Sequence, residues 1–543
     1  MLDFRDFTAV TTLGDMLLRA AAHQPDKDAL VFPTERRNYA ELAAGATRWA
    51  RGLVALGVKP GEHVGLLLPS CIEFAEAFFG VALIGAVAVP VNARYRSHEL
   101  GYLTKNADLV ALITTTRVAE KVDFVERLNE AFPDLATTRD GEPLALAEAP
   151  ELRSIILVGE GAAPGFTTRP QFDALADSCS AEEALRRRRS VSVRDVGLIL
   201  YTSGTTSNPK GCLISHEAVI RTGQALSIRY AITQDDVFWS PLPMYHIGAI
   251  FPICAIFSVE ATYLSMSHFD AGTALAMLER ERATVTYPSF GTFIGEMIYH
   301  PDFAKTDLSR VRVMNSNLAV QPESFREALR KAMPHTIQVG TFGMTETSGT
   351  VCTSALDDSY DERTRRLGRP LPGLEVRILR ENGDEAASDE IGQIAVRGFS
   401  LLSGYYKDPE KTAQALRGGW FHTGDLGSLD ASGTIMFHGR LKDMLKVGGE
   451  NVAAQEVESI VSLHDAVKLC QVVGRPDARL AEVPVAFVEL KPGAAATPDE
   501  IIAFCRPRIA SFKVPRDVRF VTEWPMSASK IQKFMLVKML EAS

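Results

Sequence analysis

Cysteine is scarce in this sequence, and the few that occur form no pattern typical of metal ligands. The 543 residues include seven cysteines, scattered from Cys71 to Cys505, with no Cys-x-x-Cys pair and no His/Cys spacing of a zinc site. An odd, scattered set of this kind is typical of a protein from a reducing cytosol. We therefore expect each cysteine to be a small buried residue.

Positive charge is not in excess, and long apolar runs are missing. The formal net charge is −9, whereas a nucleic-acid partner would favour a basic face, so we expect no nucleic acid as a main partner. The stretch from 77 to 93 has 17 residues without charge, but it contains Gly80, Gly85 and Pro90. It predicts a buried helix followed by a buried strand, not a membrane span.

Targeting signals are also missing from both ends. The first six residues carry three charges in place of an apolar signal segment. The last four, "LEAS", are not a peroxisomal address. The expected protein is cytoplasmic and has no integral membrane segment.

Strand-length and helix-length patterns alternate along most of the chain. Apolar runs such as "VGLLLP" from 64 and "VGLILY" from 196 are separated by amphipathic segments such as 39–57. This alternation predicts an α/β architecture with largely parallel sheets. After about Leu441 the order becomes helix, strand, strand, helix, which predicts a compact α+β unit. We expect a large domain over 1–440 and a small one over 441–543.

The stretch "YTSGTTSNPKG" (201–211) has too few apolar side chains to fill a core. It follows a strand-length run and precedes Ser215, a candidate helix N-cap, so the expected order is strand, loop, helix. Exposed N–H groups of glycines, several hydroxyls and Lys210 suit phosphates. The alternative is a flexible surface turn without a binding role, but the joint occurrence of glycine, serine, threonine and lysine in so short a stretch favours phosphate binding.

Four later stretches have the same small, polar, glycine-rich character. The first two suggest a loop carrying Thr345 and Glu346 and a turn that presents Asp425 between two glycines. Any one of them alone could be a solvated turn, but their joint occurrence indicates one site. The stretches are "TFGMTETSG" (341–349), "GWFHTGDLG" (419–427), "HGRLKDMLKVGGEN" (438–451) and "PMSASKIQKFML" (525–536).

Together, these motifs resemble the adenylate-forming superfamily of acyl-CoA synthetases, peptide-synthetase adenylation domains and firefly luciferase, from about Leu13 to Leu540. The resemblance is strongest to carboxylate–CoA ligases of the carnitine/crotonobetaine and fatty-acid type. It implies a large N-terminal domain of stacked mixed sheets with helices, and a small mobile α+β domain. It also implies an AMP-forming acid–thiol ligase that uses ATP, Mg²⁺, CoA and a carboxylic acid, with a homodimer as a possible assembly.

The resemblance also assigns roles to individual residues. The nucleotide-binding set is Thr202, Ser203, Gly204, Thr205, Thr206 and Lys210 for the β- and γ-phosphates, Asn317 and Phe342 beside adenine, Thr345 at the α-phosphate, and Asp425 with Arg440 at the ribose. The remaining set is Glu346 for Mg²⁺, Lys530 between carboxylate and α-phosphate, Lys442 as the hinge, Gly448 and Gly449 beside the pantetheine arm of CoA, and His246 as the gate of the acyl pocket.

The residue types suit the implied chemistry. A carboxylate attacks the α-phosphate of ATP and expels pyrophosphate, so a cation such as Lys530 must stand between two anions. The CoA thiol then attacks the acyl-adenylate, which water would destroy in an open site. A rotating small domain with Lys530 on one face and Gly449 on another meets both needs.

The sequence departs from the family pattern at a few places, and alternatives remain. Ser529 replaces a usual glycine before Lys530, and "NSNL" (315–318) replaces a Gly-Gly-Ala-type strand end, which predicts an unusual acyl pocket. An adenylating enzyme that passes the acyl group to a carrier protein or an amine is the main alternative. A non-catalytic nucleotide-binding protein is disfavoured because every charged catalytic position is filled. Luciferase-like oxygenation is more remote.

Overall fold

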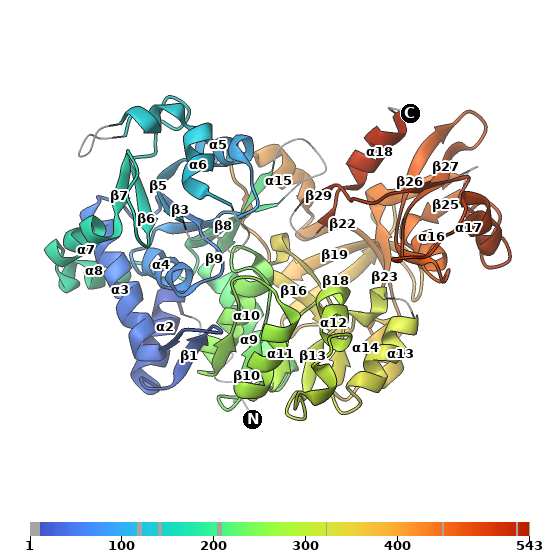
Figure 1. Ribbon diagram of the computed structural model, residues 1–543, viewed down its shortest axis with the longest axis horizontal. Helices are drawn as coiled ribbons and strands as arrows, with labels where there is room; N and C mark the ends of the chain where they lie inside the picture. Colours follow the sequence, from blue (N-terminus) through green and yellow to red (C-terminus); the bar gives the residue numbers. More distant parts are fainter. Residues whose placement is uncertain are drawn as a thin grey trace.

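The computed structural model describes residues 11–116, 122–138, 144–202, 209–321, 323–447, 450–527 and 530–541. It confirms the predicted α/β class, with a large N-terminal part of several sheets and a small C-terminal α+β part (orange to red in Figure 1). Five of the seven cysteines are buried as expected, whereas Cys71 and Cys179 are partly exposed.

The first large sheet has eight strands and contains the predicted apolar runs from 64 and 196. Its inner strands are parallel, and two antiparallel strands close one edge. In spatial order the strands are β20 (Gly404–Tyr405), β9 (Lys210–Ser215), β8 (Val196–Thr202), β4 (Val87–Pro90), β3 (His63–Leu67), β5 (Leu109–Thr115), β6 (Ser154–Val158) and β7 (Phe166–Thr168).

The second large sheet has seven strands, all parallel except the edge strand β2. Parallel strands end at the same edge of a sheet, where α/β proteins place their ligands. In spatial order the strands are β14 (Ile337–Val339), β13 (Val313–Asn315), β12 (Val285–Thr286), β10 (Val237–Trp239), β11 (Thr262–Leu264), β1 (Asp28–Val31) and β2 (Arg36–Asn38).

Helices cover these two sheets and form much of the core between them. The helix and strand predicted over 77–93 are α4, which is buried except for Glu73, and β4, which is fully buried. The helix predicted from Tyr39 begins with a capping box made by Asn38 and Glu41. The helices of this part are α2 (Leu13–His23), α3 (Tyr39–Ala55), α4 (Ile72–Leu83), α5 (Ser97–Asn106), α6 (Phe124–Ala131), α7 (Arg169–Ser178), α8 (Ala181–Arg188), α9 (His216–Arg229), α10 (Ile247–Ser258), α11 (Ala271–Arg280), α12 (Gly291–Ile298), α13 (Glu323–Ala332) and α14 (Tyr360–Arg365).

Two smaller antiparallel sheets complete the N-terminal part and carry several predicted site residues. Antiparallel pairing lets residues on neighbouring strands face each other directly. One sheet is β15 (Thr341–Met344), β16 (Gly349–Thr353) and β17 (Arg369–Pro370). The other is β18 (Leu374–Leu379), β19 (Gly392–Gly398), β22 (Trp420–Leu429), β21 (Leu416–Arg417) and β23 (Ile435–Arg440), with α15 (Pro409–Ala415) between β20 and β21.

The C-terminal part has its own sheet and its own apolar core. The core is formed mainly by valines of the central strands and of α16. Strand β23 ends at Arg440, a short 3₁₀ turn covers Leu441–Asp443, and the separate sheet begins at Met444. The boundary at 440/441 remains a prediction. The elements are β24 (Met444–Val447), β25 (Glu450–Ala453), α16 (Ala454–Val461), β26 (Val467–Asp477), β27 (Ala481–Leu490), α17 (Pro498–Cys505), β28 (Asp517–Phe520), β29 (Met526–Ser527), β30 (Lys530–Ile531) and α18 (Lys533–Glu541).

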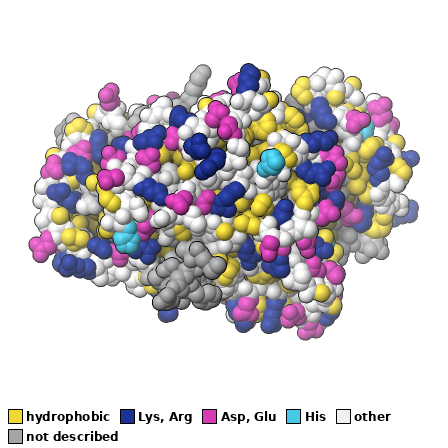
Figure 2. All heavy atoms as spheres, turned by 90° about the horizontal axis from the view of Figure 1, so that it is seen from below, with side chains coloured by type: hydrophobic (Ala, Val, Ile, Leu, Met, Phe, Trp, Pro, Cys, Tyr) yellow, Lys and Arg dark blue, Asp and Glu magenta, His cyan; other side chains and the backbone are white. Residues whose placement is uncertain are grey.

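Positive and negative side chains are interspersed over the molecular face shown in Figure 2. Among the described residues, no helix is both long and apolar enough to cross a membrane.

Candidate active site

The predicted phosphate loop connects two antiparallel strands. Thr202 at the end of β8 pairs with Lys210 at the start of β9. The expected order is strand, loop and helix, but a second strand, β9, lies between the loop and the helix. It forms because Cys212 and Ile214 are buried and pair with β8. Helix α9 follows as predicted, with the Ser215 side chain accepting from the Ala218 N–H. The predicted residues Ser203, Gly204, Thr205 and Thr206 lie outside the described residues.

Among the described residues, no carboxylate forms an ion pair with Lys210. Its Nζ lies 5.2 Å from the ring centroid of Tyr405, on the neighbouring strand β20. The nearby Asp408 is hydrogen-bonded to Lys411 instead. A cation held on an aromatic face keeps its charge for an anion, so Lys210 suits a phosphate.

Glu346 meets the same tyrosine from the other side. The Tyr405 hydroxyl donates to Oε1 of Glu346 at 3.2 Å. The partly exposed Glu346 lies in a 3₁₀ turn, Thr345–Thr347, that connects β15 to β16. The structure thus brings Lys210 and Glu346, which are far apart in sequence, into contact with the same side chain, Tyr405. Tyr405 was not identified from the sequence as a site residue.

The pKa values of Cys212 and Tyr405 reflect the burial of the cluster that they form with Lys210 and Glu346. Burial raises the pKa of the Cys212 thiol, and the negative charge of Glu346 raises it further. Burial also raises the pKa of Tyr405, again with a contribution from Glu346. Cys212 and Tyr405 are therefore neutral at physiological pH, and the charges of the cluster are those of Lys210 and Glu346.

The turn that carries Thr345 and Glu346 has a fixed backbone. Thr347 Oγ1 accepts from the Met344 N–H at 3.2 Å. A side chain at Gly343 would place its Cβ 2.1 Å from the Gly349 carbonyl oxygen, so this hairpin requires glycine at 343. The expected loop is thus a tight connection between two strands.

Of the residues predicted beside adenine, Phe342 lies in β15, the strand that follows β14, and Asn317 lies just after the end of β13. Phe342 is 6% exposed and packs near Phe437, with ring centroids 6.3 Å apart. Asn317 adopts a left-handed backbone (φ +47°), and its Oδ1 accepts from the Thr341 N–H at 2.7 Å. The Asn317 amide therefore holds the start of the strand that carries Phe342.

Asp425 and Arg440 face each other on adjacent strands. They are register partners on β22 and β23, and Arg440 Nε lies 3.4 Å from Asp425 Oδ1. The alternative of a solvated turn around Asp425 does not hold, because the residue lies within the ten-residue strand β22 and is 5% exposed. The positive φ of Gly424 (+72°) and an irregular register beside Leu426 explain why the sequence resembled a turn.

His246 lies at the N-cap of α10 and is exposed. Helix α10 approaches the Glu346 hairpin through Phe251, because a Cβ at Gly349 would lie 2.4 Å from the Phe251 ring. Phe251 also makes an edge contact with Tyr287, at the end of β12, and Tyr287 shares a 3.1 Å hydrogen bond with Thr350. These contacts connect the helix that begins at His246 to the turn that carries Glu346.

The remaining predicted residues belong to the C-terminal part. Lys442 lies in the turn Leu441–Asp443, and the backbone of Lys530 begins β30. Gly448, Gly449 and Ser529 lie outside the described residues.

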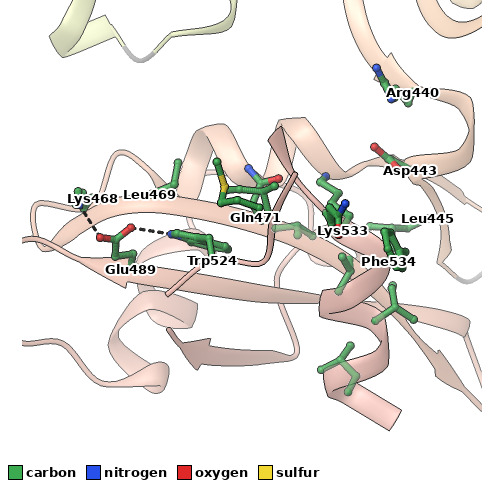
Figure 3. Close-up of a pocket in the computed structure, with 18 of the residues that line it drawn as sticks. Arg440, Asp443, Leu445, Lys468, Leu469, Gln471, Glu489, Trp524, Lys533 and Phe534 are labelled. Carbon is green, nitrogen blue, oxygen red and sulfur yellow. Dashed lines mark hydrogen bonds and ion pairs between the residues drawn. The ribbon is translucent and has the colours of Figure 1, made fainter. Parts of the chain in front are cut away.

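A cleft of about 1420 Å³ separates the two parts of the chain. Met526 and Ile531, on the hairpin that carries Lys530, line one side, and Phe290 and Gln321 of the N-terminal part line the other. Figure 3 draws residues of this cleft, where Glu489 accepts from both Lys468 and Trp524. The β29–β30 hairpin therefore faces the large domain.

Comparison with known proteins agrees with this arrangement. The model of the AMP-binding enzyme family matches residues 17–406, and that of the AMP-binding enzyme C-terminal domain matches 456–530. The chain belongs to the AMP-binding enzyme family. This assignment confirms the resemblance to adenylate-forming enzymes and the fold class of a large and a small domain.

Two of the similar proteins are named after different acids. The protein named "Putative acyl-CoA synthetase YngI" of Bacillus subtilis, whose name gives no acid, is 35% identical over 97% of this chain and 96% of its own length. A methyl-dioxo-octahydro-indenyl propanoyl:CoA ligase of Rhodococcus jostii is 33% identical over 97% of this chain and 98% of its own. The solved anthranilate CoA ligase AuaEII, in complex with anthranoyl-AMP, has 27% identity and a TM-score of 0.85 and covers 100% of this chain and 99% of that one.

These matches confirm the predicted reaction. This member of the AMP-binding family is an ATP-dependent acid–thiol ligase that forms an acyl-adenylate and then a CoA thioester. Its substrates are a small-molecule carboxylic acid, ATP and CoA. The alternative acceptors, a carrier protein or an amine, gain no better support.

Proposed function

We propose that Lys210 and Glu346, together with the pair of Asp425 and Arg440, bind ATP for the adenylation step. The single observation that carries this proposal is the convergence of Lys210 and Glu346 on Tyr405. Lys210 attracts the outer phosphates with a charge that the described residues leave available. Asp425, acceptor-only when ionised, holds the ribose hydroxyls, and Arg440 keeps its carboxylate in place.

Glu346 has the chemistry of a magnesium ligand. Mg²⁺ takes oxygen ligands and is commonly held by one or two carboxylates together with substrate phosphates and water. One Glu346 oxygen accepts from Tyr405, the other has no partner among the described residues, and the side chain is partly exposed. The described residues contain no cluster of three or more His, Cys, Asp or Glu that could hold a metal. A single carboxylate that acts together with the triphosphate oxygens fits the ligand preferences of Mg²⁺, which would neutralise phosphate charge when bound.

Lys530 is proposed to stabilise the charge that develops as the carboxylate attacks the α-phosphate. The orientation of the β29–β30 hairpin toward the large domain supports this role. Thr345 is proposed to touch the α-phosphate from the adjacent turn, and Phe342 with Asn317 to border adenine. His246 is proposed to gate the acyl pocket from the start of α10.

The thioester step is proposed to use a second orientation of the small domain. Lys442 lies in the short turn between the two sheets, which suits a hinge. Gly448 and Gly449 are proposed to border the pantetheine arm in that orientation, where a side chain would obstruct the thiol. We also propose a cytoplasmic location and a homodimer, which cell fractionation and analytical ultracentrifugation respectively test.

The acid is to be identified with a panel of carboxylic acids. The relatives indicate the arms of the panel: fatty acids of several lengths, ring-bearing propanoates and aromatic acids. Pyrophosphate release is measured with ATP and Mg²⁺, with and without CoA, and products are separated by mass. We expect one class of acid to give an acyl-CoA. Pyrophosphate release that yields an amide or a protein-bound acyl group, with no CoA thioester, would contradict the proposed acceptor step.

A further inference from the structure

The Tyr405 side chain contacts both Lys210 and Glu346, through interactions of different kinds. Its ring lies under the Lys210 ammonium at 5.2 Å, and its hydroxyl donates to Glu346 Oε1 at 3.2 Å. The hydroxyl can be removed alone, or together with the ring, so comparison of the two changes separates the two contacts. Neither contact neutralises the charge it touches.

The backbone around Tyr405 is fixed by hydrogen bonds that do not depend on its side chain. Its N–H donates to Thr412 Oγ1 at 2.8 Å, and β20 pairs with β9 through Gly404 and Tyr405. A Cβ at Gly404, which has φ +156°, would lie 3.1 Å from Thr412. A substitution of the Tyr405 side chain therefore leaves this strand pairing available.

The same segment is joined directly to the Glu346 turn. The Leu402 N–H donates to the Glu346 carbonyl oxygen at 2.9 Å, and Ser348 Oγ donates to the Ser400 carbonyl oxygen at 2.7 Å. Residues 400–406 thus form a strap, attached at one end to the Glu346 turn and at the other to the strand that begins at Lys210. Tyr405 is the side chain of this strap that faces both charged groups.

We propose that Tyr405 is a positioning residue that sets where Lys210 and Glu346 stand relative to one triphosphate. Its hydroxyl occupies one oxygen of Glu346 and orients the other toward the cation that accompanies ATP. Its ring holds the Lys210 ammonium by a cation–π contact that leaves the charge free for phosphate. This inference rests on the proposed role of the cluster in ATP binding.

The first test separates metal dependence from nucleotide affinity. Tyr405→Phe removes the hydroxyl and keeps the ring. ATP binding in EDTA, measured by titration calorimetry, should stay within about twofold of the wild type because the Lys210 contact remains. The Mg²⁺ concentration for half-maximal ATP binding should rise about tenfold, the usual effect of losing a hydrogen bond to a metal ligand.

The second test removes the ring as well. Tyr405→Leu should weaken ATP binding in EDTA about threefold or more, because Lys210 loses its aromatic face. Its Mg²⁺ requirement should rise as in Tyr405→Phe. The matched control is Tyr406→Phe, since the Tyr406 hydroxyl donates to Asp108 and not to Glu346; this variant should leave both quantities unchanged.

A double-mutant cycle with Glu346→Gln decides whether the hydroxyl acts through Glu346. Adding Tyr405→Phe to Glu346→Gln should cause no further change in the Mg²⁺ requirement. An independent tenfold effect in that background would overturn the proposal. So would equal losses of metal-free ATP binding in Tyr405→Phe and Tyr405→Leu, or losses that simply follow a lower melting temperature. If no acid releases pyrophosphate in the wild type, the proposed reaction site is wrong. The ATP-binding measurements still test the role of Tyr405 in that case, because they do not depend on the reaction.

Discussion

At the residue scale, two charged side chains of the candidate site are positioned by uncharged groups and not by ion pairs. Lys210 lies on an aromatic ring, and Glu346 accepts from a neutral hydroxyl. Asp425 differs, because it is paired with Arg440 across two strands. An ionised carboxylate can accept several hydrogen bonds at once, so its pairing with Arg440 does not prevent Asp425 from accepting from ribose hydroxyls.

Replacing Asp425 with alanine should lower kcat/KM for ATP about 10²- to 10⁴-fold, since two ribose hydroxyls lose their acceptor. The reason is the loss of hydrogen bonds to a charged acceptor, each contributing about 1.5–3 kcal/mol. Steady-state kinetics over a range of ATP concentrations measure the change. The control is Asp430→Asn, at the far end of the β22–β23 pairing, where Asp430 pairs with Arg366. A similar loss in both variants would contradict a ribose-binding role for Asp425.

Replacing Lys530 with alanine should lower the rate of adenylation about 10²- to 10³-fold, the usual effect of losing one preorganised charge-stabilising group. Thioester formation from supplied acyl-adenylate and CoA should stay nearly intact. Lys533→Ala is the control, because Lys533 pairs with Glu458 inside the small domain at 2.6 Å. Equal loss of both steps in Lys530→Ala would show that the residue does not act in adenylation alone.

At the element scale, the turn Leu441–Asp443 is the only described connection between the β23 sheet and the β24 sheet along the chain. These three residues belong to no strand, and they separate two sheets whose strands are regularly hydrogen-bonded. Such a segment can absorb a large change in backbone angles while each sheet moves as a rigid unit.

Lys442→Pro should preserve one half-reaction and abolish the other. Proline fixes φ and removes an N–H, so the turn is held near one orientation. Pyrophosphate release without CoA reports on adenylation, and thioester formation from supplied acyl-adenylate reports on the second step. Ala431→Pro is the control, because Ala431 follows Asp430 in the β22–β23 turn, where Gly433 N–H donates to the Asp430 carbonyl oxygen. Normal rates for both steps in Lys442→Pro would exclude a hinge at this residue.

Elements whose signal is local were predictable from the sequence, and those formed by distant pairing were not. The helix from Tyr39 and the helix–strand pair over 77–93 follow from periodicity and capping. The strand β9 and the position of Asp425 within β22 depend on neighbouring strands, which a periodic pattern does not reveal. Tyr405 lies on a two-residue strand, and its partners Lys210 and Glu346 are distant in sequence, so no motif indicated it.

At the scale of the whole molecule, a buried histidine joins the N-terminal helix to the first large sheet. His216 is 1% exposed, and its Nδ1 accepts from the Leu13 N–H at 3.3 Å. It also lies against Gly197 of β8, where a Cβ would come within 2.8 Å of its ring. The neutral imidazole is thus packed among α2, α9 and β8, and a proton added there would put a charge in the core.

Burial lowers the pKa of His216 from 6.5 to about 4, the charges of Asp195 and Asp15 offsetting this only in part. Above pH 6.5 neither the folded nor the unfolded chain protonates this group, so its contribution to stability is constant. As pH falls from 6.5 to 4, the unfolded chain takes up the proton and the folded chain does not. Stability should therefore fall in that window, by about 2 kcal/mol between pH 7 and pH 5.

Urea unfolding at pH 7 and pH 5 tests this, followed by fluorescence of Trp49 and Trp239, which are buried in the large domain. His216→Gln keeps an acceptor for the Leu13 N–H but cannot take up a proton in this range. Its stability should be lower than that of the wild type at pH 7, because its shape fits less well, yet it should change less between the two pH values. Carboxylates that both proteins share contribute equally to the two pH effects, so their contribution cancels when one effect is subtracted from the other. Equal pH effects in the wild type and His216→Gln would show that another group controls acid sensitivity in this range.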